Sequence, residues 1–128
     1  MMTIKEMARN LDCRGVLQCF FGLNSEDIKV YEAIEKGFER IEEISAHLGK
    51  KDNAVYKSIQ KLLISGLVYR EKKVLEGGGY CFVYRPIPRE EVAREVESIL
   101  DEFCTKVRQM LRDFLDRSSR LQGLQDLR

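Results

Sequence analysis

The last forty residues of the chain carry a long apolar stripe that a single small domain cannot bury. Its positions follow one another in alternating steps of three and four: Ala93, Val96, Leu100, Phe103, Val107, Met110, Phe114, Arg117, Leu121 and Leu124. This spacing is a heptad seam with one interruption, at Arg117, and it is widened by Ile99 and Leu111. Exposed apolar surface of that extent is unfavourable, so the helix must pack on its own domain or on another copy.

We therefore expect a C-terminal dimerisation helix over residues 89–122, followed by a frayed tail over residues 123–128. The six central seam positions, from Val96 to Phe114, are the expected interface of a homodimeric coiled coil.

The segment before the seam predicts several short helices followed by a β-hairpin. An N-terminal helical segment covers residues 1–22, and Gly15 can divide it. Asn24 is a good N-cap, because Asp27 three residues later can complete a capping box for a helix that ends near Gly37. A short helix from Arg40 to His47 then precedes a tight turn.

The turn leads into a further helix, over residues 51–65, and then into two strand-like runs. Residues 67–75 and 80–88 are rich in β-branched and aromatic side chains and flank a glycine-rich loop, which indicates a hairpin. This order is that of a helix-turn-helix with an added wing, over residues 23–88. The sequence therefore predicts a mainly α fold with a small β-hairpin, followed by the long helix.

Charge is unevenly distributed along the chain, although the net charge is only +1. Residues 24–47 contain seven acids against three bases, and residues 48–75 contain seven bases against two acids. The overall charge argues against a generally basic nucleic-acid binder, but one local basic face can still meet a polyanion.

The sequence also predicts against several other classes of protein. No apolar run is long enough to span a membrane, and the N-terminus has no apolar stretch typical of a signal peptide, so we expect a cytoplasmic protein without a membrane partner. No catalytic motif, phosphate-binding loop or dinucleotide pattern is present, which predicts that the chain is not an enzyme and has no cofactor. No pattern indicates a pocket for a small-molecule effector.

The helix beginning at residue 51 has a polar face that suits a DNA major groove. Asn53 and Gln60 can pair with adenine, and lysines can reach guanine or phosphate. The wing adds basic side chains for phosphate or minor-groove contacts. The candidate DNA-binding residues are Lys51, Asn53, Tyr56, Lys57, Gln60, Lys61, Arg70, Lys72 and Lys73.

The four cysteines, Cys13, Cys19, Cys81 and Cys104, form no C-x-x-C pair, and there is one histidine, so a structural zinc site is not expected. We expect reduced thiols that are mostly buried, with cysteine-based redox sensing as an alternative. Phe82 is expected in the core or the seam, as are Phe20, Phe21, Phe103 and Phe114.

Three stretches in order resemble the winged-helix domain of the TrmB-type archaeal transcriptional regulators: GLNSEDIKVYEAI, IEEISAHLGKKDNAVYKSIQKLLISGLV and FVYRPIPREEV. The resemblance covers about residues 20–92. It implies a sequence-specific, double-stranded-DNA-binding regulator that acts as a dimer through its C-terminal helix. Larger members carry a sugar-binding domain after that helix, and we do not expect effector recognition of that kind here.

The leading hypothesis is thus a homodimeric transcriptional regulator that places helix 51–65 in the major groove and hairpin 67–86 on the backbone or minor groove. The alternative is a winged-helix protein–protein interaction module without DNA binding. The acidic helices or the seam would then be the working surface.

Overall fold

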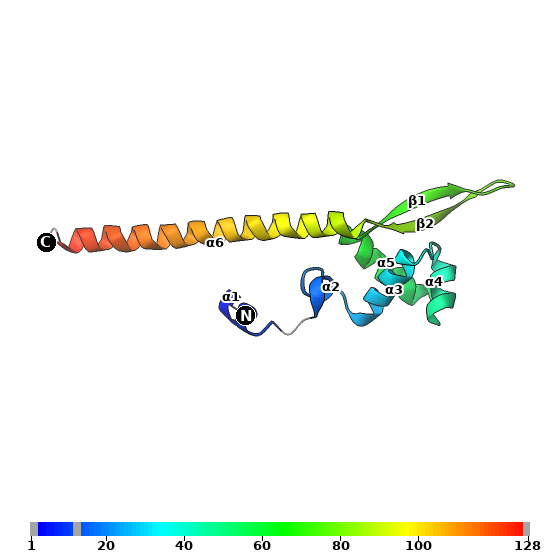
Figure 1. Cartoon of the computed structure of the whole chain (residues 1–128), viewed down its shortest axis with the longest axis horizontal. Coiled ribbons are helices and arrows are strands. Elements are labelled where there is room, and N and C mark those ends of the chain that lie inside the picture. The colour runs from blue at the N-terminus through cyan, green and yellow to red at the C-terminus, as the bar shows by residue number, and fades with distance from the viewer. Residues whose placement is uncertain (1–2, 12–13, 127–128) are drawn as a thin grey trace. The chain divides into compact units, whose positions relative to one another are not determined.

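The computed structural model describes residues 3–11 and 14–126, and side chains as far as Arg117. Its elements are α1 (Ile4–Arg9), α2 (Gly15–Cys19), α3 (Ser25–Glu35), α4 (Ile41–Leu48), α5 (Asp52–Ile64), β1 (Val68–Val74), β2 (Tyr80–Pro86) and α6 (Arg89–Asp126) (Figure 1). The chain divides into two units, Met1–Pro88 and Arg89–Arg128. The predicted fold class, mainly helical with one hairpin and a long C-terminal helix, is confirmed.

The core of the first unit lies among α3, α4, α5 and the base of the hairpin, which contact one another. Its fully buried side chains are Leu23, Val30, Tyr31, Ile34, Ile44, Val55, Ile59, Leu62, Leu67 and Val83. On α5 the buried positions Val55, Ile59 and Leu62 are spaced by four and three, so they share one face of the helix. The opposite face of α5 is therefore left for solvent or a partner.

Two local signals fix the ends of the helices that precede α5. The side chain of Asn24 accepts a hydrogen bond from the backbone N–H of Asp27 at 2.9 Å, and the carboxylate of Asp27 accepts one from the backbone N–H of Asn24 at 3.1 Å. This is the expected capping box. Gly49 follows α4 with φ +66°, a left-handed conformation that only glycine adopts at little cost. The chain thereby turns sharply from α4 into α5.

The hairpin pairs β1 with β2 antiparallel, with Val68 opposite Pro86 and Val74 opposite Tyr80. Gly77, Gly78 and Gly79 at its tip all have positive φ, so the turn depends on glycine. The hairpin is joined to the connection between α3 and α4, because the backbone N–H of Tyr84 donates to the carbonyl of Glu39 at 2.8 Å.

The N-terminal segment forms two short helices, α1 and α2, with Gly15 starting the second. The helix α6 runs to Asp126, past the predicted end at residue 122. None of the helices in the described ranges is long and apolar enough to cross a membrane.

The expected burial of the cysteines is wrong where the structure describes them, whereas the expected reduced state holds for Cys81 and Cys104 and not for Cys19. Cys19 and Cys104 are exposed and Cys81 is partly buried. Cys81 and Cys104 are free thiols, whereas Cys19 is disulfide-bonded. Cys13 lies outside the described residues.

Candidate nucleic-acid interface

The outer face of α5 presents an open row of polar side chains. Lys51, Asn53 and Lys57 are exposed, and no described side chain forms a hydrogen bond or ion pair with any of them. Tyr56 is 46% exposed, and its hydroxyl accepts a hydrogen bond from the amide of Gln60 at 2.8 Å. The structure thus exposes all six residues predicted in this segment, with Lys51 as the N-cap of α5 and the other five on the helix itself.

Lys61 differs from the other five, because it is paired with a buried carboxylate. Its Nζ lies 3.0 Å from Oδ2 of Asp27, a residue that is only 2% exposed. The hydroxyl of Ser58 donates to Oδ1 of the same carboxylate at 2.7 Å. Burial raises the pKa of Asp27, but the hydrogen bonds from Ser58, Lys61 and Asn24 outweigh it and hold this pKa below its usual value. Lys61 therefore helps to fix α5 to α3.

Ion pairs join the acidic and basic segments at two further places. Lys50 pairs with Glu26, and Lys73 lies 3.1 Å from Glu39. The hydrogen bond from Lys73 lowers the pKa of Glu39. Together with the pair of Lys61 and Asp27, these contacts neutralise part of the basic segment within the fold. The sequence shows an acidic and a basic segment, but it does not show that their side chains form ion pairs with each other in the fold.

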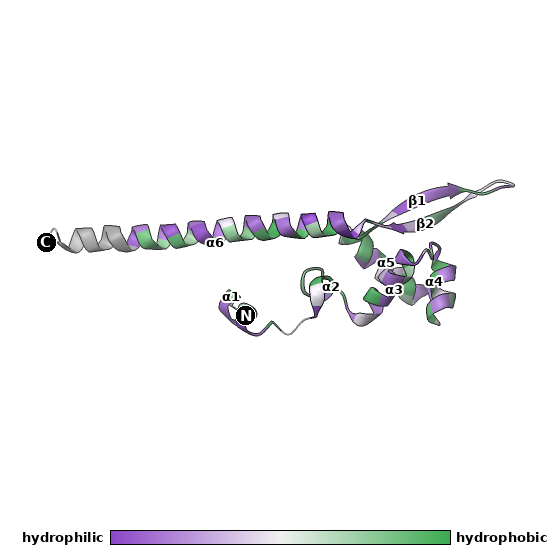
Figure 2. Cartoon of the chain, in the orientation of Figure 1, coloured by the Kyte–Doolittle hydropathy of each residue, from purple (hydrophilic) through white to green (hydrophobic). Residues whose placement is uncertain are grey.

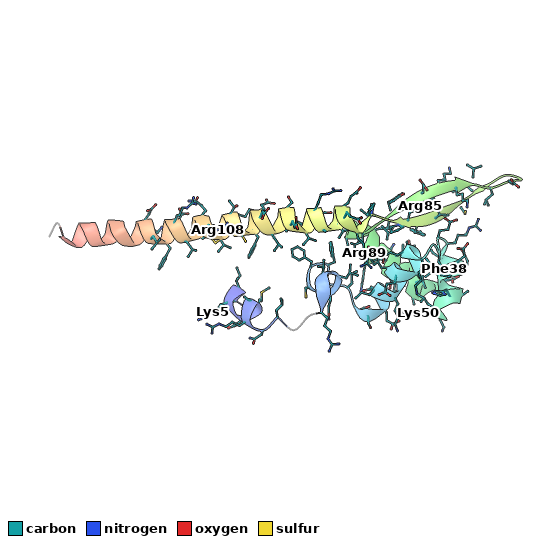
Figure 3. The ribbon with its side chains drawn as sticks, viewed as in Figure 1. Lys5, Phe38, Lys50, Arg85, Arg89 and Arg108 are labelled. Atoms are coloured by element: carbon teal, nitrogen blue, oxygen red, sulfur yellow. The ribbon has the colours of Figure 1, made fainter. Side chains whose placement is uncertain are left out.

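The two faces of the hairpin carry different chemistry, because alternate residues of a strand point to opposite faces. Arg70 and Lys72 share one face, and Lys73 lies on the other. Lys73 and Arg85 there contact acids: Arg85 lies 2.5 Å from Glu71 and 3.4 Å from Glu39. Figure 3 labels Arg85 on the hairpin. That face is close to charge balance, so it offers less to a polyanion.

The Arg70 face combines cations with aromatic rings. The guanidinium of Arg70 lies 4.2 Å from the ring centre of Phe82, and Nζ of Lys72 lies 3.9 Å from that of Tyr80. The two rings contact each other edge-on at 5.6 Å. Phe82 is 39% exposed, so its predicted place in the core is wrong. The period-two alternation of β2 is the signal that could have placed it on this face.

An open hollow of about 580 Å³ lies between this face of the hairpin, α4 and α5. Its lining includes Arg40, Glu42, Tyr56, Arg70, Phe82 and Tyr84. Burial raises the pKa of Tyr84. α5 and the hairpin border this concave surface and carry the exposed cations Lys57, Arg70 and Lys72, and Lys51 is the N-cap of α5. A helix and a basic hairpin arranged in this way are the parts of a winged helix-turn-helix.

The comparisons with known proteins identify the family. Residues 17–90 match the model of the family described as sugar-specific transcriptional regulator TrmB, and the chain belongs to this family. It is a family of transcriptional regulators, as the resemblance in the sequence implied.

Two relatives and one solved structure are also similar to this chain. The chain is 30% identical over 100 residues to the uncharacterized protein MJ1082 of Methanocaldococcus jannaschii, covering 77% of this chain and 82% of the relative. It is 28% identical over 100 residues to MJ1503 of the same organism, covering 77% and 76%. A possible transcriptional regulator from Methanosarcina mazei Go1 shares the fold, with a TM-score of 0.61 and 22% identity over 77% of this chain and 84% of that one.

Proposed function

We propose that the protein is a sequence-specific DNA-binding transcriptional regulator in which α5 is the recognition helix. The observation that carries the proposal is the outer face of α5, where Lys51, Asn53 and Lys57 are exposed and without partners in the described chain. A major groove admits one helix and presents both acceptors and donors. Lysines reach guanine or phosphate there, and the amides of Asn53 and Gln60 suit adenine.

The hairpin contributes the second contact in this proposal. Arg70 and Lys72 project from the face that carries no described acidic partner for them, whereas Lys73 is paired with Glu39. Arg70 and Lys72 therefore contact phosphates or enter the minor groove, and Lys73 stabilises the fold. Lys61, held by Asp27, contributes less than the rest of the predicted set.

A homodimer formed through α6 completes the proposal. Green, hydrophobic stretches recur along α6 in Figure 2. Leu100 is 44% exposed, Phe103 47%, Met110 63% and Phe114 70%, and all four lie on the predicted seam. Val96, the first residue of the predicted interface, is already buried in the single chain. Pairing of two copies would remove the exposed part of the stripe from water and present two recognition helices to a two-fold DNA site.

Charge reversal on α5 tests the recognition helix. Lys51→Glu with Lys57→Glu replaces two exposed, unpaired cations and disturbs no described contact, so the protein should fold as before. We expect DNA affinity to fall at least about 100-fold at moderate salt, because two contacts to the polyanion become repulsive. Lys61→Glu is avoided, because it would place a second acid beside the buried Asp27.

The matched control is Arg108→Glu, a charge reversal in the middle of α6 and outside the seam (Figure 3). It should leave DNA affinity within about twofold. Full affinity in the α5 double variant, with circular dichroism unchanged, would refute the recognition helix and favour a protein-docking module instead.

A further inference from the structure

The charges beside the exposed stripe of α6 indicate the direction in which two copies pair. This inference rests on the homodimer proposed above and concerns only its geometry. The part of the stripe that bears on this geometry begins at Ile99, which is 43% exposed. Its core positions are Leu100, Phe103, Val107, Met110, Phe114 and Arg117.

Two opposite charges border this stripe on the same edge. Lys106 directly precedes the core position Val107, and Asp113 directly precedes Phe114, so both occupy the heptad position called g. In the single chain Lys106 lies 3.4 Å from Glu102, with both side chains about two-thirds exposed. Asp113 accepts a hydrogen bond from Gln109 at 3.1 Å. These exposed contacts within one helix are weak and leave both charges accessible.

A parallel pair of helices uses these charges poorly. In parallel coiled coils each core residue faces its own copy, so Arg117 would meet Arg117 of the partner subunit in a core layer. A residue at g faces position e of the next heptad on the partner. Lys106 would then face Leu111 of the partner subunit and find no opposite charge there.

An antiparallel pair satisfies the same positions. With the two-fold axis between residues 108 and 109, Val107 faces the partner's Met110 and Phe103 faces the partner's Phe114. Arg117 then faces the partner's Leu100 and no longer a second arginine. The g edges of the two helices run side by side, and Lys106 lies opposite the partner's Asp113. Symmetry repeats this pair, so the dimer has two of them.

We propose that α6 pairs antiparallel with a second copy of the chain, with Lys106 of each subunit facing Asp113 of the other. α6 begins at Arg89, and the two-fold axis lies between residues 108 and 109. The two copies of Arg89 are therefore separated by a helix length of about 39 residues. At 1.5 Å per residue, the two starting points are about 58 Å apart along the coiled coil. The two winged helices are therefore joined to opposite ends of it, whereas parallel pairing would join them at the same end.

A charge-swap experiment on the full chain tests the direction. Lys106→Glu and Asp113→Lys each create two like-charge pairs in the antiparallel dimer. Each should raise the dimer dissociation constant about tenfold, measured by sedimentation equilibrium at low salt. The double variant Lys106→Glu with Asp113→Lys should restore the dimer, and so should an equimolar mixture of the two single variants. Arg108→Glu, on the outer side of the helix, should have no such effect.

Rescue cannot arise within one helix, because positions 106 and 113 are about 10 Å apart along its axis. Circular dichroism of each variant separates loss of helix from loss of pairing. If the single variants dimerise normally, or if neither the double variant nor the mixture restores pairing, the antiparallel direction is wrong. The proposed function does not depend on that direction, and a dimer that still binds DNA would continue to support it. If the unmodified protein stays monomeric at all concentrations tested, the homodimer and its direction both fail.

Discussion

Ser58→Ala tests whether the buried Asp27 fixes α5 to α3. Ser58 is 6% exposed, and its hydroxyl donates to the Asp27 carboxylate at 2.7 Å. Removing the hydroxyl leaves a buried anion with two remaining donors, the backbone N–H of Asn24 and Nζ of Lys61. A hydrogen bond to a charged group contributes about 1.5–3 kcal/mol. We expect the variant to lose about 2 kcal/mol of unfolding free energy.

Urea unfolding measures this loss. With a slope of about 2 kcal/mol per molar, the midpoint should fall by about 1 M at equal protein concentration. Ser25→Ala is the matched control, because Ser25 is exposed in the first turn of α3 and should shift stability by less than about 0.5 kcal/mol. A midpoint for Ser58→Ala within the error of the unmodified protein would refute the role assigned to the network.

The same network makes stability depend on pH. The folded-state pKa of Asp27 is lowered, so its contribution is complete above the unfolded-state value of about 4 and is lost as the pH falls through the folded-state value. The difference in stability between the unmodified protein and Ser58→Ala should therefore be constant near neutral pH and shrink below about pH 4. A difference that grows in acid would contradict this assignment.

Three further outcomes follow from the turn, the hairpin and the helix α6. Gly49→Ala should cost about 1 kcal/mol in urea unfolding, because φ is +66° there, and an unchanged midpoint would refute that strain. Lys72→Gln should weaken DNA binding and reduce the slope of log affinity against log salt concentration by about one, whereas Lys73→Gln should leave that slope unchanged. Equal slopes for the two variants would contradict the assignment of Lys72 and Lys73 to different faces of the hairpin. Phe114→Glu should raise the dimer dissociation constant, measured by light scattering, at least about 100-fold, because it places a charge at a core position of both copies. A dimer of normal affinity would show that the seam is not the dimer interface.

Regular patterns made most of the fold predictable. The capping box at Asn24, the glycines at residues 49 and 77–79, and the three-four spacing in α5 and α6 each act locally, so the sequence alone locates these elements. The hairpin followed from two β-rich runs around a glycine loop. These signals need no knowledge of distant contacts.

The candidate site was less predictable, because its division depends on long-range contacts. Lys61 and Lys73 look like Lys57 and Lys72 in the sequence, yet they pair with Asp27 and Glu39, each thirty-four residues away. No local pattern shows which lysines meet an acid in the fold. The aromatic face of the hairpin depends on register, which pairs Lys72 with Phe82 and Val74 with Tyr80.

Selection of binding sequences from a randomised duplex library with the purified protein tests most directly whether α5 is a recognition helix. We expect enrichment of a two-fold-symmetric site, with affinity that falls steeply as salt rises and enrichment that is lost in the Lys51→Glu, Lys57→Glu variant. No enrichment at low salt, or the same site enriched by the double variant, would contradict the claim that α5 reads DNA.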